Sequence, residues 1–317
     1  MRVARYVERR LLHSTALLIA ISALTFGISQ LAPGSFLDEM KLNPQISAET
    51  IAGLRAHYGL DQPLPVRYFR WLKSVAAGDF GYSLAYNLPV SKLVWERLGN
   101  TLLLGGAAMT LAWVLALACG IWSGYKAQLW LDRIFVASST LLLGTPELAL
   151  ALLFIVVAAR FGNSSYFAAE PRGARGWITL YRLAIPAVVL AMAAFPILFR
   201  HIRSAMNEAW HSPFVQAAKG HGIGNARLLL RHTLPAAANP LISLFGLSLG
   251  GLVSGSFLVE VITGWPGVGP LFLEAIYARD FYLVMAVVML FSVFLIASNL
   301  IADLLLYAAD PRVRAEC

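Results

Sequence analysis

Charged residues in this chain of 317 residues are clustered, and the clusters leave apolar runs of about 20 residues that are nearly free of charge. A helix of that length crosses the hydrocarbon core of a bilayer. Only 13% of the residues are charged and 58% are hydrophobic, whereas a soluble domain usually has about 25% charged residues. The sequence therefore predicts an all-α, polytopic membrane protein rather than a soluble protein with a large core.

Six of these runs are candidate transmembrane helices. They cover residues 11–31, 101–124, 134–159, 183–199, 238–262 and 283–307. Gly144-Thr145-Pro146 interrupts the third run and predicts either a kink there or an interfacial start of that helix. The first run follows four arginines, as a secretory signal would, but its apolar part is too long and no clean cleavage site follows it. We expect this run to stay in the protein as an uncleaved span.

Basic residues in the short loops predict the orientation of the spans. They are concentrated in the N-terminal segment, in residues 200–235, in the loop after the second run and in the C-terminal tail, whereas the loops on the other side carry fewer. Lys and Arg are enriched in cytoplasmic loops, so both termini are expected in the cytoplasm. The same bias explains the net charge of +8 without a nucleic-acid partner.

The predicted organisation has three parts. Residues 1–100 hold the first transmembrane helix and a long extracytoplasmic loop, residues 101–310 hold a five-helix core with a cytoplasmic loop at 200–236, and residues 311–317 form a cytoplasmic tail. Within the long loop, residues 66–72 place apolar and basic side chains at helical spacing. We expect an ordered amphipathic segment on the outer membrane surface rather than a solvated connector.

The cytoplasmic loop contains a motif of small residues. It reads Gln216-Ala217-Ala218-x3-Gly222, followed after nine residues by His232-Thr233-Leu234-Pro235. Proline has no backbone N–H and glycine tolerates positive φ, so Pro235 and Gly222 predict a short helix bounded by breakers. A short helix exposed on one side of a membrane is suited to docking.

The spacing of this motif resembles the cytoplasmic loop of ABC-importer membrane subunits, whose pattern is Glu-Ala-Ala-x3-Gly-x9-Ile-x-Leu-Pro. In that family the loop carries a coupling helix that sits in a groove of the ATPase subunit. Gln216 stands where the family has Glu, and His232 stands where it has Ile. The resemblance therefore implies a set of ATPase-coupling positions, namely Gln216, Ala217, Ala218, Gly222, Leu234 and Pro235.

Motifs along nearly the whole chain carry the same resemblance. They are Gly59-Leu60-Asp61-Gln62-Pro63, Gly78-Asp79-Phe80-Gly81-Tyr82-Ser83, Trp265-Pro266-Gly267-Val268-Gly269 and Asp310-Pro311-Arg312-Val313-Arg314. Together and in this order, they look like the first permease subunit of the dipeptide, oligopeptide and nickel importers. The resemblance implies the type I ABC importer fold in a bacterial inner membrane. It also implies half of a translocation pathway for peptides or similar small solutes, nickel included.

The resemblance implies partners as well: a second, homologous permease, two cytoplasmic ATPase subunits and an extracytoplasmic solute-binding protein, all working at a lipid bilayer. ATP and Mg are expected on the ATPase subunits, because this sequence has no Gly-x4-Gly-Lys-Ser/Thr phosphate loop. We expect no cofactor or metal on the chain itself, since His211, His221 and His232 are too widely spaced to share one helix face.

Two alternatives to a transport subunit remain open. An intramembrane enzyme would need a nucleophile and a base within the spans, where His13, near the start of the first run, is the one histidine available. A membrane scaffold or receptor would lack transport altogether. Co-purification with an ATPase would separate both from an importer.

Polar and small residues within the apolar runs are the remaining candidates. Glu147 follows Pro146, and it could either line the translocation path or be a first-turn acid that the helix dipole favours. Small residues at roughly four-residue spacing allow helices to approach closely. Such spacing occurs in the fifth run at Gly246, Gly250, Gly251 and Gly255, where we expect helix packing, with a dimer-interface or pore-lining role as the alternative.

Overall fold

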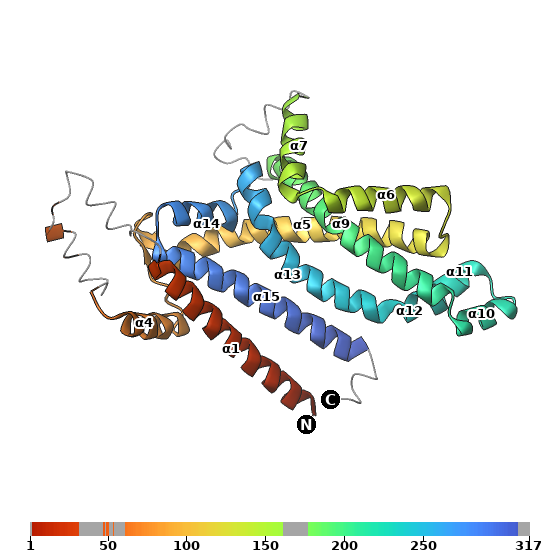
Figure 1. Ribbon diagram of the computed structural model, residues 1–317, viewed down its shortest axis with the longest axis horizontal. Helices are drawn as coiled ribbons and strands as arrows, with labels where there is room; N and C mark the ends of the chain where they lie inside the picture. Colours follow the sequence, from red (N-terminus) through yellow and green to blue (C-terminus); the bar gives the residue numbers. More distant parts are fainter. Residues whose placement is uncertain are drawn as a thin grey trace. The chain divides into compact units, whose positions relative to one another are not determined.

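The computed structural model describes residues 2–31, 47, 49, 50, 53, 61–160 and 177–309. Helices dominate these residues (Figure 1). The chain divides into two compact units, one of residues 3–101 with 266–293 and one of residues 102–265 with the chain from 294 onward. The predicted tail at 311–317 and most of the first half of the long loop lie outside the described residues.

In the first unit, helix α1 (Arg2–Leu31) packs against helix α4 (Leu64–Ala76). The rings of Phe26 and Tyr68 meet edge to face with centroids 5.3 Å apart, and the Tyr68 hydroxyl lies 2.8 Å from Ser22 Oγ. α4 begins directly after Pro63 and has a second proline in its first turn, where a fixed φ favours a helix. Trp71 is buried beside Phe26. The helix predicted around residues 66–72 is thus present and packed rather than a solvated connector.

This unit also contains a small hairpin, two further helices and residues 90–101, which begin a long helix of the second unit. Strands β1 (Tyr82–Ser83) and β2 (Leu88–Pro89) pair antiparallel, and α14 (Val268–Tyr277) precedes the first half of α15 (Phe281–Ala309).

The buried Asp280 carboxylate ties the hairpin to α15. It accepts hydrogen bonds from the Ser83 hydroxyl at 2.6 Å, the Ala85 N–H at 3.1 Å and the Leu283 N–H at 3.2 Å. The Tyr86 hydroxyl donates a hydrogen bond to Glu274 of α14. Burial is the larger cause, and this hydrogen bond the second, of a pKa of Tyr86 that is raised to about 12. Asp280 therefore caps a helix and holds the hairpin with a single side chain.

The second unit is a helical core. It contains α6 (Trp130–Gly144), α7 (Glu147–Arg160), α9 (Trp177–Trp210), α13 (Ala238–Thr263) and the second half of α5 (Val90–Tyr125). α9 is central, because α6, α7 and α13 all pack against it. Its Phe199, Ile202 and Met206 are completely buried.

Several helices extend beyond the apolar runs that predicted them. α5 begins at Val90 rather than at residue 101, and α9 covers Trp177–Trp210 rather than 183–199. Hydrophobicity marks the part of a helix that crosses the membrane, whereas the helix itself continues until a breaker such as Pro89. Pro186 and Pro196 lie inside α9 without ending it.

Within the described residues, four helices are long and apolar enough to cross a membrane: Arg10–Leu31, Val90–Tyr125, Arg182–Trp210 and Phe281–Tyr307. Three bent helix pairs would bring the total to seven if each pair counted as one span. The interruption at 144–146 is one of these bends, because α7 turns away from α6 by 102° there (Figure 1). The protein is thus a helical membrane protein, and the count of six spans stays a prediction.

Candidate coupling site

A short helix stands where the small-residue motif predicts one. Helix α10 (Pro213–Gly220) follows Ser212, whose backbone is extended, and has Pro213 in its first turn. It ends before Gly222, which adopts the predicted left-handed conformation with φ +78°. Pro213 therefore marks the start of α10. The prediction that Pro235 bounds this helix is wrong, because Pro235 lies in α12.

Pro235 instead lies in a second, nearly continuous helical stretch. This stretch consists of α11 (Asn225–Leu228), a π-helix η1 (Leu229–Thr233) and α12 (Leu234–Ala236), and it leads into α13. Pro235 has no N–H to donate into the preceding turn, and that turn is the π-helix η1 rather than a regular α-helical turn. Pro235 thus continues a path toward the membrane core.

One face of α10 is fixed to the end of α9. Val215 is completely buried against Trp210 and Leu228, with Ala218 and Ile223 partly buried around them. The Gln216 amide donates to the Trp210 carbonyl oxygen at 3.0 Å. A movement of α10 would therefore be carried into α9 through packed side chains.

The other face of α10 is open. Phe214 is 51% exposed although it is a large apolar residue, and Ala217, Lys219 and Gly222 are exposed as well. Of the other motif positions, Leu234 is half-buried and Pro235 is exposed. Sequence reasoning missed Phe214, whose signal is an aromatic residue next to a helix-starting proline in a polar loop.

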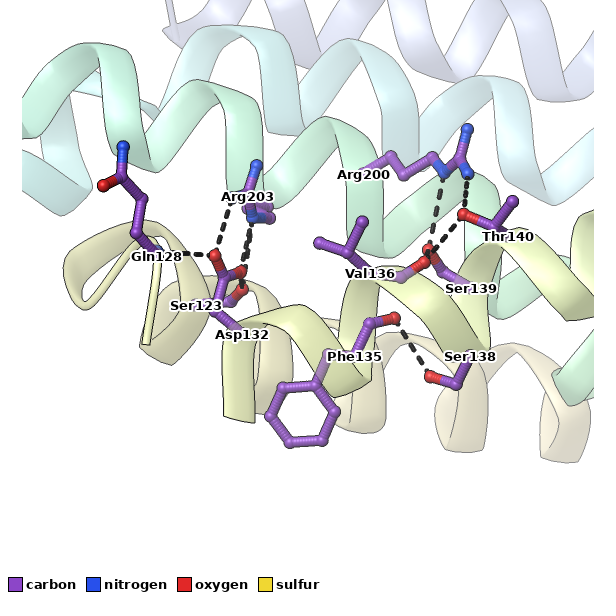
Figure 2. A network of polar contacts seen from close by, with 10 residues as sticks. All are labelled: Ser123, Gln128, Asp132, Phe135, Val136, Ser138, Ser139, Thr140, Arg200 and Arg203. Carbon is purple, nitrogen blue, oxygen red and sulfur yellow. Dashed lines mark hydrogen bonds and ion pairs between the residues drawn. The ribbon is translucent and has the colours of Figure 1, made fainter. Parts of the chain in front are cut away.

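A buried ion pair anchors α9 to the first turn of α6, at a point of α9 that is close to α10 in the chain (Figure 2). Arg203 donates to the two carboxylate oxygens of Asp132 at 2.7 and 2.8 Å. Asp132 also accepts from the Ser123 hydroxyl and, at 2.8 Å, from the Gln128 N–H. Its side chain is only 3% exposed, so the bidentate arginine is its main source of compensating charge.

A second arginine on α9 makes weaker contacts with α6. Figure 2 shows Arg200 reaching the hydroxyls of Ser139 and Thr140, at 3.4 and 2.7 Å. These partners are neutral, and the Arg200 side chain is exposed. Arg200 therefore offers a matched comparison for Arg203.

The α5 backbone lies directly against α9 at two glycines. A Cβ built at Gly124 would come within 2.7 Å of the Met206 Cβ and 2.9 Å of the Arg203 carbonyl oxygen, and one at Gly120 would come within 2.7 Å of Ile202. The four-residue spacing of these glycines was available as a signal for close helix approach. Together with the ion pair, this contact makes α5, α6 and the end of α9 a firm base for α10.

The glycines of α13 divide into two pairs. A Cβ at Gly246 would overlap the Ala302 Cβ of α15, and one at Gly250 would lie 2.8 Å from Leu295. At Gly251 and Gly255, a Cβ would have no described atom within 4 Å. Only the first pair is therefore positioned to allow close approach of α15.

Glu147 is the first residue of α7, directly after the break at 144–146. Its Oε1 atom is buried and has no hydrogen-bond partner among the described residues. A carboxylate oxygen enclosed without a donor is costly, so this site favours a cation or a donor from outside the described chain.

Comparison with known proteins identifies the family. A sequence profile described as "Binding-protein-dependent transport system inner membrane component" matches residues 116–315, and a profile of its N-terminal part matches residues 3–105. The chain belongs to this family. Its members are membrane components of importers, so the chain is the permease subunit of an ABC importer and works with a separate ATPase subunit.

Similar members of the family cover almost all of the chain. The oligopeptide transport system permease protein AppB of Bacillus subtilis is 33% identical and is matched over 98% of this chain and 99% of its own length. The dipeptide transport system permease protein DppB of Lactococcus lactis is 31% identical over 98% and 100% of the two chains. The glutathione transport system permease protein GsiC of Salmonella paratyphi A is 31% identical over 98% of each.

Two solved structures of ABC transporters share the fold of this chain. An inward-facing structure of the MetNI methionine ABC transporter superposes with a TM-score of 0.55 at 20% identity, over 69% of this chain and 96% of that chain. An amino acid ABC transporter crystallised with histidines superposes with a TM-score of 0.51 at 18% identity, over 68% of this chain and 92% of that chain. At these identities, the likeness extends to the helical fold.

Proposed function

We infer that this permease forms half of the translocation pathway for peptides, paired with a second, homologous permease in a bacterial inner membrane. The names of its relatives, which carry oligopeptides, dipeptides and glutathione, support peptides as the solute class. The chain would cross the membrane in six spans, with both termini in the cytoplasm. Two ATPase subunits would bind ATP and Mg, and an extracytoplasmic solute-binding protein would deliver the peptide, while this chain holds no cofactor.

The observation that carries the coupling role is the two-faced helix α10. Its inner face is packed on Trp210 through Val215, and its outer face presents Phe214 and Ala217. A small apolar surface of this kind suits a groove on a partner protein. Nucleotide binding would move the ATPase subunits, and α9 would receive that movement through α10, provided that the ATPase states bind α10 differently.

Replacing Gly222 by valine tests this role. A β-branched residue at φ +78° costs about 1–2 kcal/mol in backbone strain, although a Cβ there meets no described atom. We expect the end of α10 to shift and peptide uptake by the reconstituted importer to fall several-fold, while the complex still assembles.

Gly224→Val is the matched control, because Gly224 has φ −61° and equally open surroundings. Uptake should remain near the level of the unchanged chain. Equal uptake by the two variants at equal abundance would contradict a coupling role for the end of α10, and the absence of any peptide uptake by the unchanged importer would contradict the solute class.

Glu147 is the residue that we propose to line the pathway. A peptide carries an N-terminal ammonium, which would donate a hydrogen bond to the Glu147 Oε1 that has no partner among the described residues. Glu147→Gln keeps the shape and removes the charge, so we expect the KM for peptides with a free N-terminus to rise by about tenfold or more.

Two comparisons make this test specific. N-acetylated peptides should show no such change, because they lack the ammonium. Glu208→Gln, which alters an exposed acid on α9, should leave the KM for both kinds of peptide unchanged. An equal response of free and acetylated peptides to Glu147→Gln would assign Glu147 a structural role as a first-turn acid.

A further inference from the structure

The first unit contains a pocket of about 470 Å³ that combines aromatic walls with charged groups. Arg67, Arg70 and Asp79 supply the charge, whereas Phe26, Trp71 and Phe281 supply apolar surface. The three charged groups sum to +1. A pocket of this composition suits a ligand that has one negative charge and an apolar part.

Within the part of the chain that the structure describes, the hydrogen-bonding capacity of the two arginines is largely unused. Arg67 donates one bond, to Gln30 Oε1 at 3.1 Å, out of the five N–H groups of a guanidinium. Burial lowers the pKa of Arg67, and an adjacent anion would offset that effect. Arg70 is exposed, and no hydrogen bond or ion pair joins it to another described residue.

Two further groups in the pocket have capacity for a ligand. Trp71 is only 5% exposed, and its buried indole N–H has no hydrogen-bond partner among the described residues. Among the described residues, the Gly81 N–H is the donor to Asp79, at 2.9 Å from Oδ1, and Asp79 is exposed. The pocket therefore offers donors beside an acceptor.

The pocket lies at the level where two candidate spans end. Phe26 belongs to the last turns of the apolar stretch Arg10–Leu31, and Phe281 begins the apolar stretch Phe281–Tyr307. α4 lies beside this end of α1 (Figure 1). Tyr and Trp gather where a membrane meets water, and Tyr68, Trp71 and Tyr282 stand at this level. Phosphate groups of lipids occupy the same depth.

We propose that this pocket binds the headgroup of phosphatidylglycerol. The two guanidinium groups hold the phosphodiester, since arginine matches phosphate with paired N–H donors. The glycerol hydroxyls of the headgroup donate to Asp79, and the aromatic walls contact the apolar part of the lipid below the phosphate. A bound lipid would fasten α4 to the membrane beside α1.

Native mass spectrometry of the full chain in detergent, titrated with phosphatidylglycerol, measures this binding directly. Arg70→Gln is the main variant, because Arg70 supports no described contact in the fold. We expect Arg70→Gln to retain phosphatidylglycerol about tenfold more weakly, because it loses a charge-assisted hydrogen bond. The double variant Arg67→Gln/Arg70→Gln should lose more. Lys73→Gln removes the same charge from an exposed position on α4 outside the pocket, and retention should not change.

The headgroup and the source of the phosphate are tested in the same assay. Phosphatidylcholine has no donor for Asp79, so it should be retained more weakly than phosphatidylglycerol. Inorganic phosphate at the same concentration should not displace the lipid, because it lacks the apolar part. Equal loss in Arg70→Gln and Lys73→Gln, equal retention of the two lipids, or displacement by inorganic phosphate would each overturn the proposal. Circular dichroism of each variant verifies that the helices are intact.

Discussion

Arg203→Ala is expected to unfold at a much lower temperature than the unchanged chain and to accumulate poorly in the membrane. The substitution leaves the Asp132 carboxylate, 3% exposed, without its cation. Removing one partner of a buried ion pair costs about 3–5 kcal/mol, because the remaining charge is desolvated and uncompensated. Thermal unfolding of the purified chain in detergent, together with its abundance in membranes, measures the effect.

The two comparison variants separate charge from packing. Arg200→Ala removes contacts of the same helix with neutral hydroxyls, so it should cost only about 1 kcal/mol. Adding Asp132→Asn to Arg203→Ala should recover part of the loss, because a neutral amide is less costly to bury than a carboxylate. Equal losses for Arg203→Ala and Arg200→Ala would show that the ion pair does not anchor α9.

Gly246→Ala is expected to destabilise the chain, whereas Gly251→Ala should be neutral or stabilising. A methyl group at 246 would overlap Ala302, which forces α13 and α15 apart at a cost of about 1–3 kcal/mol. At 251 no described atom obstructs the methyl group, and alanine is favoured over glycine in a helix by about 0.5–1 kcal/mol. The same unfolding measurement gives the sign of each effect.

Exchanging the residues at 246 and 302 should rescue the stability that Gly246→Ala loses. Gly246→Ala combined with Ala302→Gly moves the methyl group from α15 to α13, and it should restore much of the lost stability. A Gly246→Ala chain as stable as Gly251→Ala would mean that the α13–α15 contact is looser than the structure shows.

Some features of this fold follow directly from local sequence. α13 ends at Thr263, directly after the apolar run predicted at 238–262, because Gly264 adopts a left-handed conformation with φ +67° and closes the helix. The positive φ of Gly222 and the break at 144–146 also follow from residue type. Each of these features depends on backbone preferences within a few residues.

Other features depend on contacts between distant residues. Asp132 and Arg203 are 71 positions apart in the chain, and nothing in the local sequence pairs them. Helical spacing alone predicts that Gly246 and Gly250 lie on one face of α13 and Gly251 and Gly255 on another, but not which of the two faces meets α15. The proposed coupling role likewise comes from resemblance, whereas the contact of the buried Val215 with Trp210 and Leu228 is visible only in three dimensions.

The π-helix η1 makes the direction of α10 sensitive to the length of the loop. A π-helical turn contains one residue more than an α-helical turn, and η1 occupies Leu229–Thr233 between α11 and α12. Loss of one residue there would restore an ordinary α-helix and leave the faces on either side nearly in place, whereas a further inserted residue would turn everything on its N-terminal side by about 100° around the axis. The chain could then keep α10 seated on Trp210 or keep α13 in place, but not both. Insertions in these five positions would thus re-aim the face that carries Phe214 without altering a single residue on it.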